Sequence, residues 1–314
     1  MSNPEASFEP YRRRLLGLAY RMLGSMADAE DAVQDAYLRW HGANRETVSD
    51  PRAFLMTTTT RICLDMLTSA RARREEYVGP WLPEPVLDTA ALAPDTRTEL
   101  AEDLSIALLL TLDRLSPLER AAFLLHDVFD FSFNEVAAAL DRSAAACRQL
   151  AARARAHVRT ARPRGVTTPP GSPGPQARDG EIEMKHEQLL SAFQAAIQSG
   201  DLDRLTQLLA SDARLVTDGG GKVRAALNVI EGADRIAKFM VEATRRRPDA
   251  WWRDDFRLRF RTVNGLPGAI VEAPEGVVQT TAVEIEGGVI RAIYVVRNMD
   301  KLRHLAAARA PRQP

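Results

Sequence analysis

Two proline-rich breaks divide this chain of 314 residues and limit where its domains can lie. Residues 79–94 contain four prolines, which excludes regular helix there. Residues 163–180 are rich in Pro, Gly, Ser and Thr, a composition typical of a flexible or partly extended linker. A chain of this length suits two or three domains, each large enough to bury a core.

Everything before the second break has a helical pattern. Apolar residues recur at three-and-four spacing from about residue 8 to residue 74, and helices resume near residue 99. Ser116-Pro117-Leu118-Glu119 and Ser132-Phe133-Asn134-Glu135 are capping boxes, so each predicts a helix start. Asp141-Arg142 then predicts a tight turn and Ser143 a further N-cap. Two short helices joined in this way form a helix-turn-helix.

The part after the second break has a mixed pattern. Amphipathic helices are expected at 184–198 and 202–209, and strands at 213–217, 223–227, 256–263, 268–272, 277–285 and 289–297. Glu286-Gly287-Gly288 predicts a hairpin turn, which indicates a curved antiparallel sheet backed by helices. The predicted fold class is therefore multidomain, with two all-α modules and a C-terminal α+β domain.

The positions of the charged residues are more informative about function than the net charge of the chain. Formal net charge is zero, which argues against a general nucleic-acid binder. Arginines nevertheless gather in two places, which indicates selective docking on a polyanion. These are Arg71, Arg73 and Arg74, and then Arg142, Arg148, Arg153, Arg155, Arg159, Arg162 and Arg164.

Several other function classes are not expected. The N-terminal residues lack the basic and apolar regions of a signal peptide, and no run of ~18 apolar residues occurs, so we expect a cytoplasmic protein with no membrane partner. The two cysteines, Cys63 and Cys147, lack the spacing of a zinc or redox pair. We therefore expect no metal and no cofactor.

The second helix of the helix-turn-helix has a definable outward face. If Cys147, Ala151 and Ala154 face the core, the side chains that can read base edges are Ser143, Arg148, Gln149, Ala152 and Arg153. Arginine can bridge guanine O6 and N7, and glutamine can pair with adenine. Arg155, Arg159 and Arg162 are better placed for phosphates. The alternative is an ordinary helical hairpin with a solvated arginine face.

The second predicted helix of the chain is acidic on its polar face. Phosphates would repel such a face, so it is not a DNA surface, and its plainest alternative is a solvated helix. The next helix carries Thr57-Thr58-Thr59-Thr60, whose hydroxyls can reach a backbone or a DNA strand. Arg61 and Asp65 in that helix have the spacing of a salt bridge. The acidic residues are Asp28, Glu30, Asp31 and Asp35.

The order of these elements resembles regions 2 and 4 of extracytoplasmic-function sigma factors. The motifs that carry the resemblance are residues 28–35, Asp-Ala-Glu-Asp-Ala-Val-Gln-Asp, and 115–120, Leu-Ser-Pro-Leu-Glu-Arg. The resemblance implies that the acidic helix docks on the β′ clamp helices of core RNA polymerase, that the second module meets the β flap, and that residues 143–155 read the −35 element. It also implies −10 contacts from the loop 41–49 and the third helix, although Ile62-Cys63 replace the common Arg-Asn. The implied −10 residues are Asn44, Arg45, Arg61, Arg71, Arg73 and Arg74.

The C-terminal part resembles the SnoaL-like, NTF2-type cone that is fused to sigma factors of the SigJ type. Three short segments carry this likeness: residues 81–85, residues 218–222, here called the glycine segment, and residues 298–302, with Met299 where proline is common. The resemblance implies a contact between domains that regulates the factor in cis, without a separate anti-sigma factor. Plain hairpin geometry is the alternative for the glycine segment, which lacks P-loop spacing. The residues expected in this contact are Trp81, Pro83, Pro85, Asp218, Gly219, Gly220, Gly221, Lys222, Asn298, Asp300 and Lys301.

Five segments follow from these patterns: 1–76 as region 2, 77–98 as a linker, 99–163 as region 4, 164–182 as a second linker, and 183–314 as the cone. Two alternatives remain open at this point. The cone can be a cyclase- or isomerase-like enzyme, although His186 and His304 lie in its probable terminal segments. The chain can also be a repressor with a ligand-sensing cone, but a repressor needs no acidic docking helix. We expect no enzymatic activity.

Overall fold

The computed structural model describes residues 4–75, 77–87, 89, 92, 103–161, 176–246, 256–274 and 276–307. The chain forms two compact units. The first comprises Met1–Glu76 with Asp88–Arg162, and the second Tyr77–Leu87 with Pro163–Pro314. Tyr77–Leu87, which the sequence pattern placed in a linker, is thus part of the C-terminal unit. Helical modules and a separate α+β domain confirm the predicted fold class.

The first unit begins with three long helices: α1 (Pro4–Leu23), α2 (Met26–Gly42) and α3 (Pro51–Glu75), with the 3-10 turn η1 (Arg45–Thr47) before α3. Side chains cap the starts of α2 and α3, since Ser25 Oγ accepts from Asp28 N at 3.1 Å and Asp50 Oδ1 accepts from Ala53 N at 3.1 Å. Trp40, Tyr20 and Phe8 are buried between these helices.

The described part of the first unit further contains α5 (Ile106–Asp113), α6 (Pro117–Phe123), the π-helix η3 (Leu124–Val128), α7 (Phe133–Leu140) and α8 (Ala144–Ala161). Both predicted capping boxes are present, at Ser116 and at Ser132. Asp141 adopts a left-handed conformation with φ of 53°, and Ser143 Oγ accepts from Ala146 N at 3.2 Å. The pair α7–α8 is the predicted helix-turn-helix.

Arginine side chains tie the two helical modules of the first unit together. Arg120 is buried and donates to the carbonyl oxygen of Met22 at the end of α1, and it pairs with Asp113 at 3.2 Å. Burial lowers the pKa of Arg120 to about 10, so its guanidinium stays charged at neutral pH. Arg52 Nη2 donates to the carbonyl oxygen of Phe129 at 2.7 Å. The modules of this unit therefore pack on each other through charged donors and backbone acceptors.

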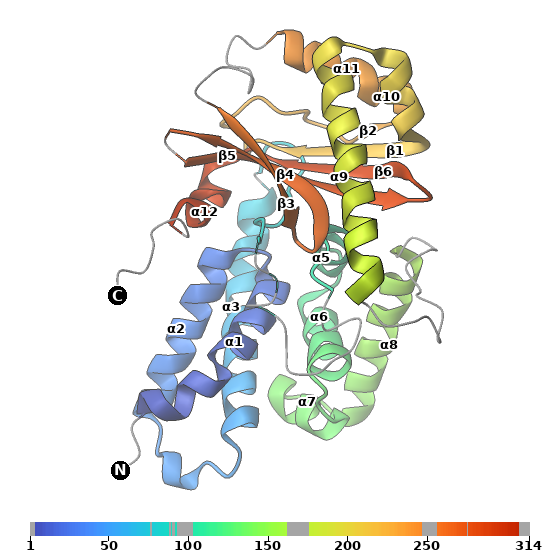
Figure 1. Ribbon diagram of the computed structural model, residues 1–314. Coiled ribbons are helices and arrows are strands. Elements are labelled where there is room, and N and C mark those ends of the chain that lie inside the picture. The colour runs from blue at the N-terminus through green and yellow to red at the C-terminus, as the bar shows by residue number, and fades with distance from the viewer. Residues whose placement is uncertain are drawn as a thin grey trace. The chain divides into compact units, whose positions relative to one another are not determined.

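The described part of the second unit contains a six-stranded sheet, one face of which is covered by α9 (Gln176–Ser199), α10 (Leu202–Leu208) and α11 (Ala233–Arg245) (Figure 1). The 3-10 turn η4 (Met299–Lys301) and α12 (Arg303–Ala307) lie on the other side of the sheet from α10 and α11. Its strands are β1 (Leu209–Asp218), β2 (Ile230–Glu231), β3 (Arg257–Val263), β4 (Leu266–Ala273), β5 (Gly276–Glu286) and β6 (Val289–Val296). Leu205, Leu215, Ile236 and Ile293 are fully buried in the core between the sheet and the helices.

The sheet order is β2-β1-β6-β5-β4-β3. The Gly287-Gly288 hairpin between β5 and β6 is confirmed, and both glycines have positive φ. Two expectations were wrong. Strand β1 pairs with β6 in parallel, so the sheet is not wholly antiparallel. Residues 223–227 form a loop rather than a strand, because Ala226 bonds to the Thr217 side chain instead of a neighbouring backbone.

Within the described ranges, no helix is long and apolar enough to cross a membrane. Across the same ranges, no group of three or more His, Cys, Asp or Glu side chains is arranged to hold a metal ion. Both cysteines are buried, and burial raises the pKa of the Cys63 thiol above its ordinary value. They are core residues of the helical unit.

Gly268 tests the packing of the sheet. A Cβ at Gly268 would lie 2.1 Å from the carbonyl oxygen of Thr281 on the neighbouring strand, so Gly268→Ala should destabilise the C-terminal unit by about 1–3 kcal/mol. Gly42→Ala is the control, since nothing lies within 4 Å of an added Cβ there. Calorimetry of the full chain should show a lower unfolding temperature for Gly268→Ala alone. An unchanged transition would contradict this packing.

Candidate functional site

Helix α8 presents the outward face that the sequence pattern predicts. Cys147, Ala151 and Ala154 are fully buried, and they set which side of the helix faces the core. Four side chains of the expected reading set lie on the exposed side of α8, and Ser143 is exposed at its N-cap. The four are Arg148, Gln149, Ala152 and Arg153.

The arginines of α8 differ in the strength of their contacts with the rest of the helical unit. Arg155 Nε pairs with Asp127 Oδ1 at 2.6 Å and so anchors α8 to η3. Arg153 pairs with Glu119 at 2.9 Å but keeps 63% of its side chain exposed. Arg148 lies over the ring of Phe133 at 5.8 Å. Arg155 is therefore a structural residue in this state, whereas Arg148 stays at the surface of the helix.

Helix α2 separates its apolar and acidic residues as predicted. Ala29, Ala32, Val33 and Ala36 are buried on one side. The carboxylates of the other side are exposed, except that Asp28 is half-buried beside the N-cap. The exposed residues are Glu30, Asp31 and Asp35.

Arg61 on α3 is hydrogen-bonded to the end of helix α7. Its Nε donates to the carbonyl oxygen of Ala139 at 3.0 Å, and its Nη2 donates to that of Ala138 at 2.9 Å. A cation at the C-terminal end of α7 is favoured by the helix dipole as well as by the two hydrogen bonds. A residue expected at the −10 element thus holds the helix-turn-helix against α3 in this state.

The other expected −10 residues are only partly described. Asn44 is exposed, while the side chains of Arg45, Arg71, Arg73 and Arg74 lie outside the described part of the structure. The threonines of α3 turn inward: Thr58 and Thr60 each donate to the carbonyl oxygen four residues earlier, both at 2.8 Å. Their hydroxyls therefore bond to the helix backbone, which was one of the two possibilities for this run.

In the second unit, residues Tyr77–Leu87, here called the strap, are held by the buried carboxylate of Asp218. Asp218 ends strand β1 and has no exposed surface. Its Oδ2 accepts from Leu82 N at 2.8 Å and from Lys301 Nζ at 2.7 Å. Its Oδ1 accepts from the Tyr77 hydroxyl and from Gly220 N at 3.1 Å. One carboxylate thus joins the strap, the glycine segment and η4.

Lys301 completes this contact from the other side. Its ammonium also donates to the carbonyl oxygen of Leu82 and lies 4.3 Å from the ring centre of Trp81 and 4.9 Å from that of Tyr77. Cation–π attraction of this kind adds to the ion pair when water is excluded. Burial and the bond to Asp218 raise the pKa of Tyr77 above its ordinary value, so the phenol keeps its proton and donates.

The glycine segment is needed for close approach. Gly220 has φ of 59°, and a Cβ there would lie 2.3 Å from Asn298 Nδ2, the group that donates to the Tyr77 hydroxyl at 2.8 Å. A Cβ on Gly221 would lie 3.0 Å from Val78 of the strap. Lys222 and Asp300 form an exposed ion pair at the edge of this contact. The three segments singled out in the sequence therefore meet in one place.

Two further contacts of the strap were not predicted. Asn264, in the turn between β3 and β4, accepts from Val86 N at 3.1 Å and donates from its own backbone to Val86 O at 2.7 Å. His304 Nε2 bonds to the carbonyl oxygen of Pro85 at 2.8 Å. The Asn264-Gly265 pair signals only a turn, so nothing local could reveal a partner so distant in the chain. Pro83 and Pro85 themselves are buried.

The two helical modules match known families. The Sigma-70 region 2 family matches residues 8–73, and the Sigma-70, region 4 family matches residues 105–158. These are the modules with which sigma factors bind RNA polymerase and promoter DNA, so they define the class of the protein.

Proteins that are similar over nearly the full length of the chain show which group of sigma factors it resembles. ECF RNA polymerase sigma factor SigJ of Mycobacterium tuberculosis is 38% identical over 94% of this chain and 92% of its own length. Probable ECF RNA polymerase sigma factor SigI of the same species is 30% identical over 95% of each. The crystal structure of M. tuberculosis SigJ superposes with a TM-score of 0.68 at 33% identity, covering 95% of this chain and 98% of that one.

The chain belongs to the extracytoplasmic-function RNA polymerase sigma factors, and it carries a C-terminal α+β cone. Its partners are core RNA polymerase and promoter DNA, and it directs transcription initiation.

Replacing Arg148 by alanine should weaken binding to a matched −35 element by about 1–3 kcal/mol, the usual discrimination of a bidentate base contact. Exposed Arg159, nearer the end of α8, is the control, and Arg159→Ala should weaken binding equally for all sequences. Titration of labelled duplexes with systematic base changes would separate the two. If both variants lost the same affinity for every duplex, Arg148 would not be a residue that reads the −35 sequence.

Proposed function

We propose that this sigma factor is regulated in cis by the hold of its cone on the strap, with no separate anti-sigma factor required. The single observation that carries the proposal is the buried carboxylate of Asp218, which bonds to the strap backbone at Leu82 and to Lys301. The strap is also part of the covalent connection between regions 2 and 4. When the cone holds the strap, it fixes the conformation of this part of the chain that joins the two promoter-binding modules. The hold limits how the modules can change their positions relative to each other.

The packing of the helical unit explains why such control has an effect. The −10 and −35 elements are, by their names, about 25 base pairs apart, or roughly 85 Å of DNA at 3.4 Å per base pair. In this state, Arg61 holds the end of α7 on α3 by hydrogen bonds of 2.9 and 3.0 Å. We infer that the modules separate when both elements are bound. A held strap favours the closed arrangement, and a released strap favours the open one.

We further propose that the exposed acidic face of α2 docks on the β′ clamp helices and that region 4 meets the β flap. Glu30, Asp31 and Asp35 lie opposite the buried stripe of α2, so a partner can reach them without unfolding the helix. A like-charged surface is unsuited to DNA and suited to a basic protein groove.

The cone acts in this account as a regulatory domain rather than an enzyme. Cyclase- or isomerase-type chemistry needs a titratable acid or base in an apolar pocket. Among the described residues that line the cavity of the cone, there is no Asp, Glu or His. His304 is engaged with the strap at Pro85. Trp251, Trp252, Asp254 and Asp255, which the sequence offers as residues that could line the mouth of such a pocket, lie outside the described residues.

Charge reversal at Asp31 and Asp35 should abolish retention by core polymerase while the helical unit stays folded, because both side chains are exposed. The control is reversal of two exposed acids of the cone, Asp203 and Asp234. Co-purification at moderate salt and circular dichroism measure the two quantities. Full retention of the Asp31→Lys/Asp35→Lys variant would refute the docking surface.

Replacing Asp218 by asparagine should raise transcription from a matched promoter without altering the −35 sequence that is read. The change leaves the buried Lys301 ammonium without its carboxylate, a loss of several kcal/mol that favours release of the strap. Asp212→Asn is the matched control, since it breaks only an exposed pair with Arg291. Reconstituted transcription with core polymerase is the assay. Equal output from parent and Asp218→Asn, with the variant folded, would refute regulation through the strap.

A further inference from the structure

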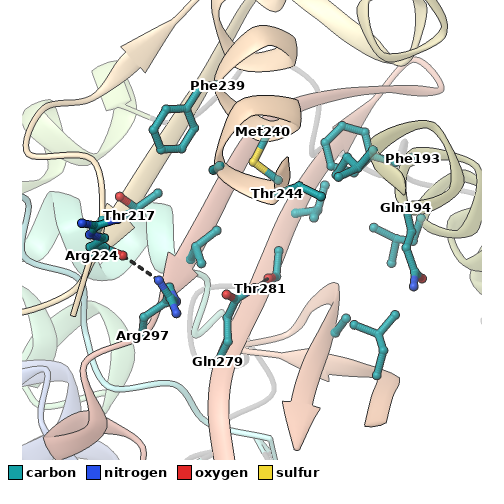
Figure 2. Close-up of a pocket in the computed structure, with 18 of the residues that line it drawn as sticks. Phe193, Gln194, Thr217, Arg224, Phe239, Met240, Thr244, Gln279, Thr281 and Arg297 are labelled. Carbon is teal, nitrogen blue, oxygen red and sulfur yellow. Dashed lines mark hydrogen bonds between the residues drawn. The ribbon is translucent and has the colours of Figure 1, made fainter. Parts of the chain in front are cut away.

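The cone contains a cavity that the strap does not use. It lies between the inner face of the sheet and helices α9 and α11, and its volume is about 90 Å³ (Figure 2). Phe193, Phe239 and Met240 close it from the helix side. Leu190, Ile197, Val283 and Val295 extend the apolar wall.

The polar groups of this cavity come mainly from one end, next to the end of β1. Arg297 and Arg224 lie there together, and Arg297 Nη1 donates to the carbonyl oxygen of Arg224 at 2.6 Å. On the sheet below them, Gln279 Nε2 donates to Thr281 Oγ1 at 3.3 Å. The described residues that line the cavity thus supply two guanidinium groups and no carboxylate. An apolar chamber with a cationic end matches a molecule with an apolar tail and an anionic head.

We propose that this cavity binds a small carboxylate whose short aliphatic tail lies between α11 and the sheet and whose anionic group meets Arg297 and Arg224. An enclosed cavity of about 150 Å³ suffices for benzene, so the smaller volume here suits a tail of a few carbon atoms. Planar guanidinium groups recognise carboxylates by paired, charge-assisted hydrogen bonds. The head is therefore the source of specificity and the tail the source of buried apolar area.

The cavity is connected to the strap through two chain neighbours. Thr217 lines the cavity and precedes Asp218, and Arg297 lines it and precedes Asn298. The backbone also joins these points, since Arg297 N and Asn298 N donate to the Asp218 carbonyl oxygen at 2.8 and 3.1 Å. A carboxylate on Arg297 thus acts on the residues that hold the strap. This second step rests on the proposed function, whereas binding itself does not.

The binding test uses the full chain and titrates butyrate, hexanoate and octanoate by calorimetry, with 1-hexanol as the neutral partner of hexanoate. Hexanoate should bind at least ten-fold more tightly than 1-hexanol. Arg224→Gln and Arg297→Gln should each weaken hexanoate binding by ten-fold or more and leave 1-hexanol unchanged. Arg297→Lys should restore part of the loss. Arg261→Gln, an exposed arginine on β3 outside the cavity, is the control and should change nothing.

Equal affinity for hexanoate and 1-hexanol, or no carboxylate binding at millimolar concentration, would overturn the site. A filling variant guards against misfolding of the arginine variants: Ala243→Phe places a ring in the cavity and should abolish binding. Retained binding in that variant would also overturn the site. Coupling is measured separately: if hexanoate binds the held and the released state with different affinity, Asp218→Asn should move the hexanoate affinity toward that of the released state. Tight binding with unchanged affinity in Asp218→Asn would uphold the site and refute its coupling to the strap.

Discussion

The buried ion pair of Asp218 and Lys301 is the interaction on which the C-terminal unit depends. Removing two charges from water is unfavourable unless every remaining hydrogen-bonding position is satisfied. Asp218 meets this condition only with the strap in place, because Leu82 N and the Tyr77 hydroxyl supply two of its donors. The pair therefore does not simply stabilise the cone. The Asp218 carboxylate has all its hydrogen-bond donors when the strap is bound and lacks two of them when the strap is released. A switch requires two states that differ in this way.

In the helical unit, too, charged side chains hold two parts of the protein together, but here each interaction is weaker than the buried ion pair. Arg61, Arg52 and Arg120 donate to backbone carbonyl oxygens across the interface between the two helical modules. Arg61 is partly exposed, so its bonds can exchange for water or phosphate with little penalty. Arg120 is buried and cannot exchange so readily. A graded interface of this kind can open at one end while it keeps the core of each module intact.

Local signals predicted much of this protein, and long-range contacts account for what they missed. The capping boxes at Ser116 and Ser132 depend on four neighbouring residues, so they could be read directly from the sequence. The outward face of α8 followed from its buried stripe. The parallel pairing of β1 with β6 and the bond from Asn264 to Val86 join segments far apart in the chain, and no local pattern specifies them. Arg61 was assigned a partner on its own helix or on DNA, whereas its carbonyl partners lie on another module.

Hydrogen exchange at the amides of Leu82 and Val86 tests the central claim most directly. Both amides donate to buried side-chain oxygens of the cone, Asp218 and Asn264, so exchange reports the hold on the strap without any substitution. If the cone holds the strap until initiation, both amides are strongly protected in the free chain and lose that protection in an initiation complex with core polymerase and a matched promoter. Equal protection of both amides in the free chain and in the transcribing complex would contradict it.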